Sequence, residues 1–186
     1  MHSAILDSFY GQDFIDWVEE EAQRVSINDA LVMTEATDAK HQEKVESTRR
    51  SKIAFLQSTQ LKDELFNVVS YLNANQFGFD IWNVADVQYT IYESSEKGHY
   101  DWHQDDQICV GVARTTVRKL SLTVQLSDPS EYEGGDFEMQ SLVLPPYVKN
   151  KGTVLLFPSP EFHRVTPVTK GVRKSLVAWF QGPSWR

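Results

Sequence analysis

Apolar side chains recur at helical spacing in two stretches of the first 80 residues. They would share one side of a helix within residues 12–25, and again in a stretch that begins near Ser58 or Thr59 and ends at about residue 74. Either hydroxyl can cap the start of this second helix. The apolar positions are Phe14, Ile15, Trp17, Val18, Ala22 and Val25 in the first helix and Leu61, Leu65, Val68, Val69 and Leu72 in the second.

A polar segment separates the two predicted helices. Residues 34–52 show no apolar periodicity, so we expect a long loop there. Long loops in compact domains often serve function, so the segment is either a lid over a binding site or a plain surface loop. Within it, Arg49, Arg50 and Lys52 form a tight basic group that we interpret as solvated.

The apolar pattern changes to a period of two after residue 80, which is typical of strands. A Gly-rich turn is predicted at residues 133–136. Many short strands with Gly- and Pro-rich turns indicate a sandwich or a jelly roll, and the fold class is α+β, mainly β. The predicted strands are residues 86–92, 119–127, 137–140, 152–157 and 173–180.

Composition is that of an ordinary globular domain. Hydrophobic residues make up 41% and charged residues 24% of the 186 residues, which favours one domain over residues 1–186. The net charge of -8 argues against a nucleic-acid partner. The single cysteine, Cys109, precludes an intrachain disulfide and favours a reduced compartment; we expect it to be a small buried residue. Without a signal peptide or an apolar span, we expect a cytoplasmic protein with no membrane partner.

His103 and Asp105 are the first candidate ligands of a metal ion. They stand two apart, so on an extended strand both side chains would point to one face. His163 follows the apolar stretch 152–157 and could join them. Two histidines and one carboxylate leave open coordination positions, the arrangement of non-haem Fe(II) oxygenases. Taken singly, each residue is more typical of an incidental turn, surface or core position.

Arg173 is the candidate anion-binding residue. It lies ten residues beyond His163, after a turn suggested by Gly171. If its side chain points inward, a buried cation needs an anionic partner, and its planar fork matches a carboxylate. The alternative is an ordinary surface arginine. We expect the other notable aromatic and histidine side chains to be structural: Trp17, Trp82 and Trp179 in the core and His2, His41 and His99 at the surface.

Several ordered motifs resemble those of 2-oxoglutarate- and Fe(II)-dependent dioxygenases, above all the prolyl 4-hydroxylase-like and PKHD-type hydroxylases. The string from His163 to Arg173, followed by Trp179, resembles their C-terminal motif. Tyr92 with residues 100–105, YDWHQD, resembles the first metal motif, and residues 126–137 resemble the segment that joins the two halves. Residues 49–56, RRSKIAFL, resemble an R-x-S motif of prolyl 4-hydroxylases more loosely.

The resemblance implies a double-stranded β-helix (jelly roll) with flanking N-terminal helices, in which residues 1–80 give helical support and the lid loop and residues 81–186 form the catalytic core. It implies that Fe(II) is bound by His103, Asp105 and His163. For 2-oxoglutarate it implies Arg173, Tyr92 and Gln125, the last standing where some relatives have a tyrosine. For substrate contact or support of the site it implies Tyr100, Arg118 and Trp179.

The implied activity is hydroxylation of a substrate carbon with decarboxylation of 2-oxoglutarate to succinate. Dioxygen is the other co-substrate, and ascorbate the reductant that restores oxidised iron. The first candidate substrate is a prolyl residue in a peptide or protein. A free amino acid or small metabolite is the second, and a jelly-roll binding module without turnover is the alternative from another class. The intact triad and Arg173 argue against that module.

Overall fold

The computed structural model describes residues 3–30, 48–106 and 114–185. Two helices, α1 (Gln12–Gln23) and α3 (Thr59–Gln76), confirm the helical predictions to within two residues at each end. Ser58 caps α3 by accepting a hydrogen bond from the Leu61 backbone N–H. His2, His41, Cys109 and residues 34–47 of the expected loop lie outside the described residues.

The strands form two antiparallel sheets. The larger has the order β1-β10-β7-β12-β5-β4-β2, with β8 paired to β12, and the smaller has the order β3-β6-β11-β9. The strands of the larger sheet are β1 (Ala4–Leu6), β2 (Asn28–Asp29), β4 (Lys52–Phe55), β5 (Asn83–Glu93), β7 (Thr116–Gln125), β8 (Tyr132–Gly134), β10 (Val154–Pro158) and β12 (Val168–Pro183). Those of the smaller are β3 (Arg49–Arg50), β6 (His99–His103), β9 (Phe137–Met139) and β11 (His163–Val165).

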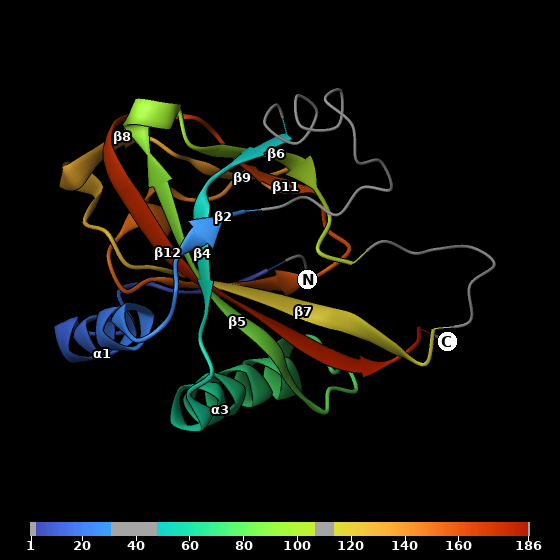
Figure 1. The fold of residues 1–186 in the computed structure, drawn as a ribbon. Helices are drawn as coiled ribbons and strands as arrows, with labels where there is room; N and C mark the ends of the chain where they lie inside the picture. The colour runs from blue at the N-terminus through green and yellow to red at the C-terminus, as the bar shows by residue number, and fades with distance from the viewer. Residues whose placement is uncertain (1–2, 31–47, 107–113, 186) are drawn as a thin grey trace, which may run out of the picture.

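The two helices pack together against one face of the larger sheet, and the smaller sheet lies on its other side (Figure 1). Residues on the helix-facing side of the strands are apolar and wholly buried, among them Leu122, Leu176 and Phe180. Two sheets with helices on one of them confirm the mainly β jelly-roll prediction. Within the described ranges, neither helix is long and apolar enough to cross a membrane.

The opposite face of the larger sheet is polar but equally buried. Its alternate positions include Gln88, Thr90, Thr123, Gln125 and Ser175, each at most 3% exposed. Strand register explains how they gather: Ser175 of β12 lies between Thr90 of β5 and Gln125 of β7. The alternation read from the sequence is therefore correct, but its polar side faces the interior between the sheets.

Three sequence-based expectations are wrong in detail. The end of the expected loop at residues 49–52 forms β3 and the start of β4. Strand β6 ends at His103, so Asp105 lies in the bend that follows and not on one extended strand with it. Trp82 was expected in the core and is 52% exposed.

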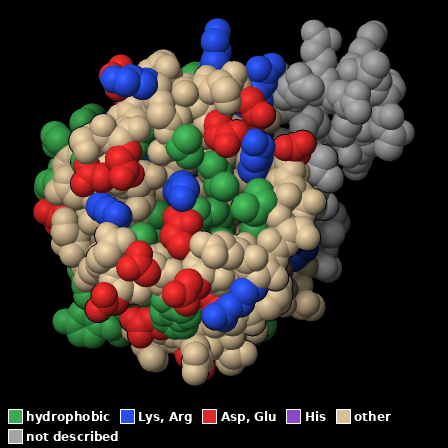
Figure 2. Space-filling view, turned by 60° about the vertical axis from the view of Figure 1, so that its left-hand side comes forward, with side chains coloured by type: hydrophobic (Ala, Val, Ile, Leu, Met, Phe, Trp, Pro, Cys, Tyr) green, Lys and Arg blue, Asp and Glu red, His purple; other side chains and the backbone are tan. Residues whose placement is uncertain are grey.

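The outer surface carries interspersed acidic and basic side chains around a group of hydrophobic ones on the face drawn in Figure 2.

Candidate metal and co-substrate site

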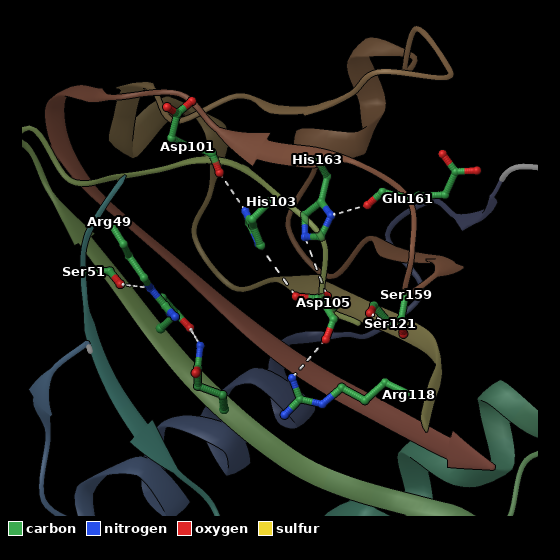
Figure 3. Close-up of polar contacts among 12 residues, drawn as sticks. Arg49, Ser51, Asp101, His103, Asp105, Arg118, Ser121, Ser159, Glu161 and His163 are labelled. Carbon is green, nitrogen blue, oxygen red and sulfur yellow. Dashed lines mark hydrogen bonds and ion pairs between the residues drawn. The ribbon is translucent and has the colours of Figure 1, made fainter. Parts of the chain in front are cut away.

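His103, Asp105 and His163 converge between the two sheets (Figure 3). Strands β6 and β11 pair antiparallel with His163 directly opposite His103, which brings together residues that are 60 positions apart in the sequence. The Nε2 atoms of His103 and His163 lie 3.7 Å and 3.6 Å from the Asp105 carboxylate oxygens. All three ligand atoms fall within 4.8 Å of one another, close enough to share one ion.

Backbone carbonyls fix the orientation of both imidazoles. The Nδ1 atom of His103 lies 2.7 Å from the Asp101 carbonyl oxygen, and that of His163 lies 2.9 Å from the Glu161 carbonyl oxygen. A carbonyl oxygen only accepts hydrogen bonds, so each Nδ1 must carry the proton as donor. This tautomer leaves the Nε2 lone pairs free and directed at Asp105, as metal-binding histidines require.

Electrostatics keeps two of these side chains in the protonation states that metal binding requires. Burial, reinforced by nearby His163, lowers the pKa of His103 to about 3. Burial opposes charge on Asp105, but His163 and His103 outweigh it and the pKa of the carboxyl falls, helped by Ser121 and Trp179. At neutral pH His103 is therefore neutral and Asp105 is charged, which suits a divalent cation.

Arg173 extends into the same cavity from β12 and is 1% exposed. Strand β5 places Tyr92 directly opposite it, and the guanidinium carbon lies 5.4 Å from the centre of that ring. Its Nη2 donates to Gln125 Oε1 at 2.9 Å, whereas Nε and Nη1 have no hydrogen-bond partner among the described residues. Buried donors on a cation are costly to leave unpaired, so this end of the cavity fits an anionic ligand such as a carboxylate.

The remaining predicted site residues fall into two groups. Tyr92, Tyr100 and Trp179 line the cavity, and the Tyr100 ring stacks on His103 with 3.4 Å between ring centres. Gln125 and Arg118 are not among the residues that line the cavity. Gln125 lies outside it and accepts the hydrogen bond from Arg173. Arg118 stacks on Trp179 at 4.1 Å and donates to the Asp105 carbonyl oxygen at 3.4 Å. The structure thus places Arg118 behind the site and not within the cavity.

Sequence reasoning missed Arg49 as a cavity residue. The interpretation of the basic group as solvated is wrong at this position, because Arg49 is 9% exposed and lines the cavity with the triad. Its Nε donates to the Ser51 hydroxyl at 2.9 Å (Figure 3). The R-x-S spacing was the available signal, since it leaves the arginine and the serine close enough to bond. His99 was expected at the surface. It is half-buried on β6, where it pairs with Arg50 of β3.

Known proteins resemble this chain in sequence. PKHD-type hydroxylases from Teredinibacter turnerae and Synechococcus sp. CC9311 are 41% identical over 86 residues and 36% identical over 95 residues. These matches cover 45% and 50% of the chain but only 38% and 41% of the relatives' lengths. The similarity is therefore confined to part of those proteins.

Solved structures share the fold at lower identity. The viral collagen prolyl hydroxylase of Paramecium Bursaria Chlorella virus-1, in its 2OG complex, superposes with a TM-score of 0.72 at 19% identity, covering 98% of this chain and 97% of that one. A prolyl hydroxylase from Trichoplax adhaerens, solved with a hypoxia inducible factor peptide fragment, gives 0.71 at 17% identity, covering 96% and 83%. The sequence model of the 2OG-Fe(II) oxygenase superfamily matches residues 87–181, just over half of the chain and the whole span from Tyr92 to Trp179. The chain belongs to the 2OG-Fe(II) oxygenase superfamily.

Proposed function

We propose that this protein is a 2-oxoglutarate- and Fe(II)-dependent dioxygenase that hydroxylates a carbon of its substrate. The observation that supports it most directly is a buried, incompletely paired Arg173 in the cavity that also holds the His103, Asp105 and His163 cluster. A metal-binding group and a separate carboxylate-binding group in one enclosed space are what a chelating dicarboxylate co-substrate requires. A binding module that needs no co-substrate would have no use for the buried charge.

Each protein group has a defined task in this proposal. His103, Asp105 and His163 would hold Fe(II), and Arg173 with Tyr92 would bind the distal carboxylate of 2-oxoglutarate. Iron and co-substrate supply the oxidative chemistry: dioxygen and 2-oxoglutarate are consumed, succinate and carbon dioxide are released, and one oxygen atom enters a substrate C–H bond. Phe137, Phe157 and Val165 line the cavity with apolar surface that limits access of water. Ascorbate would serve as the reductant.

The first substrate candidate is a prolyl residue in a peptide or protein. Its support is the fold shared with prolyl hydroxylases, one of them solved with a peptide fragment. A free amino acid or small metabolite is the second candidate. A panel of prolyl peptides, free amino acids and metabolites, scored for a +16 Da product together with succinate release, separates the two. Product from peptides alone would establish the first candidate.

The co-substrate assignment is tested without any substrate. Anaerobic addition of Fe(II) and then 2-oxoglutarate is expected to give a visible charge-transfer band. His163→Ala and Asp105→Ala should abolish the band while melting normally, because other contacts hold the backbone at both positions. His163 lies on β11, which pairs with β9, and the Asp105 backbone N–H donates to the Ser159 carbonyl oxygen at 3.0 Å. An unchanged band in either variant, or no band from the intact protein, would refute the assignment.

A further inference from the structure

Arg49 brings a second buried guanidinium to the cavity, from the opposite sheet to Arg173. Strand β3 is the edge of the smaller sheet, and its pairing with β6 sets Arg49 directly opposite Tyr100. The guanidinium carbon lies 4.5 Å from the centre of the Tyr100 ring, whose plane stacks in turn on His103. Arg49 therefore lies one aromatic ring away from the proposed metal ligand.

The partners of Arg49 within the described residues are neutral. They are the Ser51 hydroxyl, which accepts from Nε, and Tyr100, which contacts the guanidinium through its ring and its side-chain hydroxyl. No carboxylate lies within ion-pair distance of Arg49 in the described part of the chain, although Lys52 on the next strand has Glu93 at 2.5 Å. Neutral groups stabilise a cation that is about nine-tenths buried only weakly, so an anion is the missing partner.

The net charge of the cavity also indicates that an anionic group binds beside Arg49. Among its lining residues two guanidiniums, Arg49 and Arg173, stand against the single carboxylate of Asp105. A divalent ion would add two positive charges, and 2-oxoglutarate would remove two. One positive charge then remains uncompensated, and Arg173 is already assigned to the co-substrate.

We propose that Arg49 is the binding site for a carboxylate of the substrate. The proposal rests on the proposed function and narrows its substrate class to molecules with an anionic group close to the carbon that reacts. Both a free amino acid and the C-terminal residue of a peptide have such a carboxylate. The planar fork of arginine binds a carboxylate through two parallel hydrogen bonds. Because Nε of Arg49 donates to the Ser51 hydroxyl, the ligand would be bound through the terminal Nη1 and Nη2 groups.

The test measures ligand binding without turnover. Protein loaded anaerobically with Fe(II) and saturating 2-oxoglutarate is titrated calorimetrically with L-proline, N-acetyl-L-proline and N-acetyl-L-prolinamide. We expect each acid to bind at least about tenfold more tightly than the amide, as for a hydrogen bond to a charged group. Preference for L-proline over N-acetyl-L-proline identifies a free amino acid as the source of the carboxylate, and the reverse preference identifies a peptide C-terminus.

Substitution then assigns the preference to one side chain. Arg49→Gln should remove the difference between acid and amide, Arg49→Lys should retain part of it, and the neighbouring exposed Arg50→Gln should keep it in full. Equal affinities for acid and amide in the intact protein, absence of binding by all three probes, or an unchanged difference in Arg49→Gln would each overturn the proposal.

The visible band separates this inference from the proposed function. If intact protein forms the band with 2-oxoglutarate but does not discriminate acid from amide, only the carboxylate site is wrong. If the band does not form, the co-substrate assignment itself fails. If Arg49→Gln chiefly weakens 2-oxoglutarate binding, Arg49 belongs to the co-substrate site and the proposal is refuted. Melting temperatures of all variants confirm that each is folded.

Discussion

Replacement of Arg173 by methionine should uncouple stability from co-substrate binding. Arg173 is 1% exposed, but two of its three donor groups have no partner in the described residues. Methionine fills similar space and removes the buried charge, so the free energy of unfolding of the ligand-free protein should change by less than about 1.5 kcal/mol or increase. A buried side chain that was merely structural would cost about 2–5 kcal/mol on truncation.

In contrast to the free energy of unfolding, the affinity for 2-oxoglutarate should fall markedly in Arg173→Met. Loss of the charge-assisted contact is expected to cost about 1.5–3 kcal/mol, which weakens 2-oxoglutarate binding about 10- to 150-fold. At a concentration 100 times the dissociation constant, ligand stabilises the intact protein by about 2.7 kcal/mol. A variant that binds 100-fold more weakly gains only about 0.4 kcal/mol at the same concentration.

Thermal melts with and without 2-oxoglutarate, in the presence of a divalent metal, measure both effects. The intact protein should gain about 5–10 °C from the ligand, given about 2–4 °C per kcal/mol for a chain of this size. Arg173→Met should gain almost nothing. Gln125→Ala is the matched control, because it removes the Nη2 partner of Arg173 but leaves the cation. An Arg173→Met variant that keeps the ligand-induced shift would show that Arg173 does not bind 2-oxoglutarate.

Two further predictions concern packing away from Arg173. Gly152→Ala should lower the free energy of unfolding by at least about 2 kcal/mol in urea melts, because φ is +78° and an added Cβ would lie 1.9 Å from the Tyr10 carbonyl oxygen. Gly11→Ala, which meets nothing within 4 Å, is the control, and equal effects of the two would contradict the reasoning. Ser159→Ala should cost about 1–2 kcal/mol, since it removes the 2.9 Å bond to the equally buried Ser121; unaltered stability would mean that this bond contributes nothing.

The local pattern of the sequence was sufficient to predict the helices and strands and to find the candidate metal ligands. The spacing of Leu61, Leu65 and Leu72 predicts α3, and the alternation in residues 119–127 predicts β7, because these periodicities follow from backbone geometry alone. His103 and His163 were found by residue type and motif order. Arg49 was misjudged because a run of polar residues does not distinguish a solvated arginine from one that tertiary packing buries. The R-x-S spacing indicates a hydrogen bond to Ser51 but not the burial of the arginine.

Tertiary structure decided where the two faces of each strand point. The sequence determined that polar and apolar residues alternate, but only the closure of the smaller sheet over the larger one turned the polar face into a buried cavity lining. The same closure set His163 opposite His103 and buried Arg49 and Arg173 on facing sheets. The physical reason is that the burial of a strand face depends on the register of pairing with distant strands and on which other sheet or helix packs against that face. Neither is a property of the local sequence.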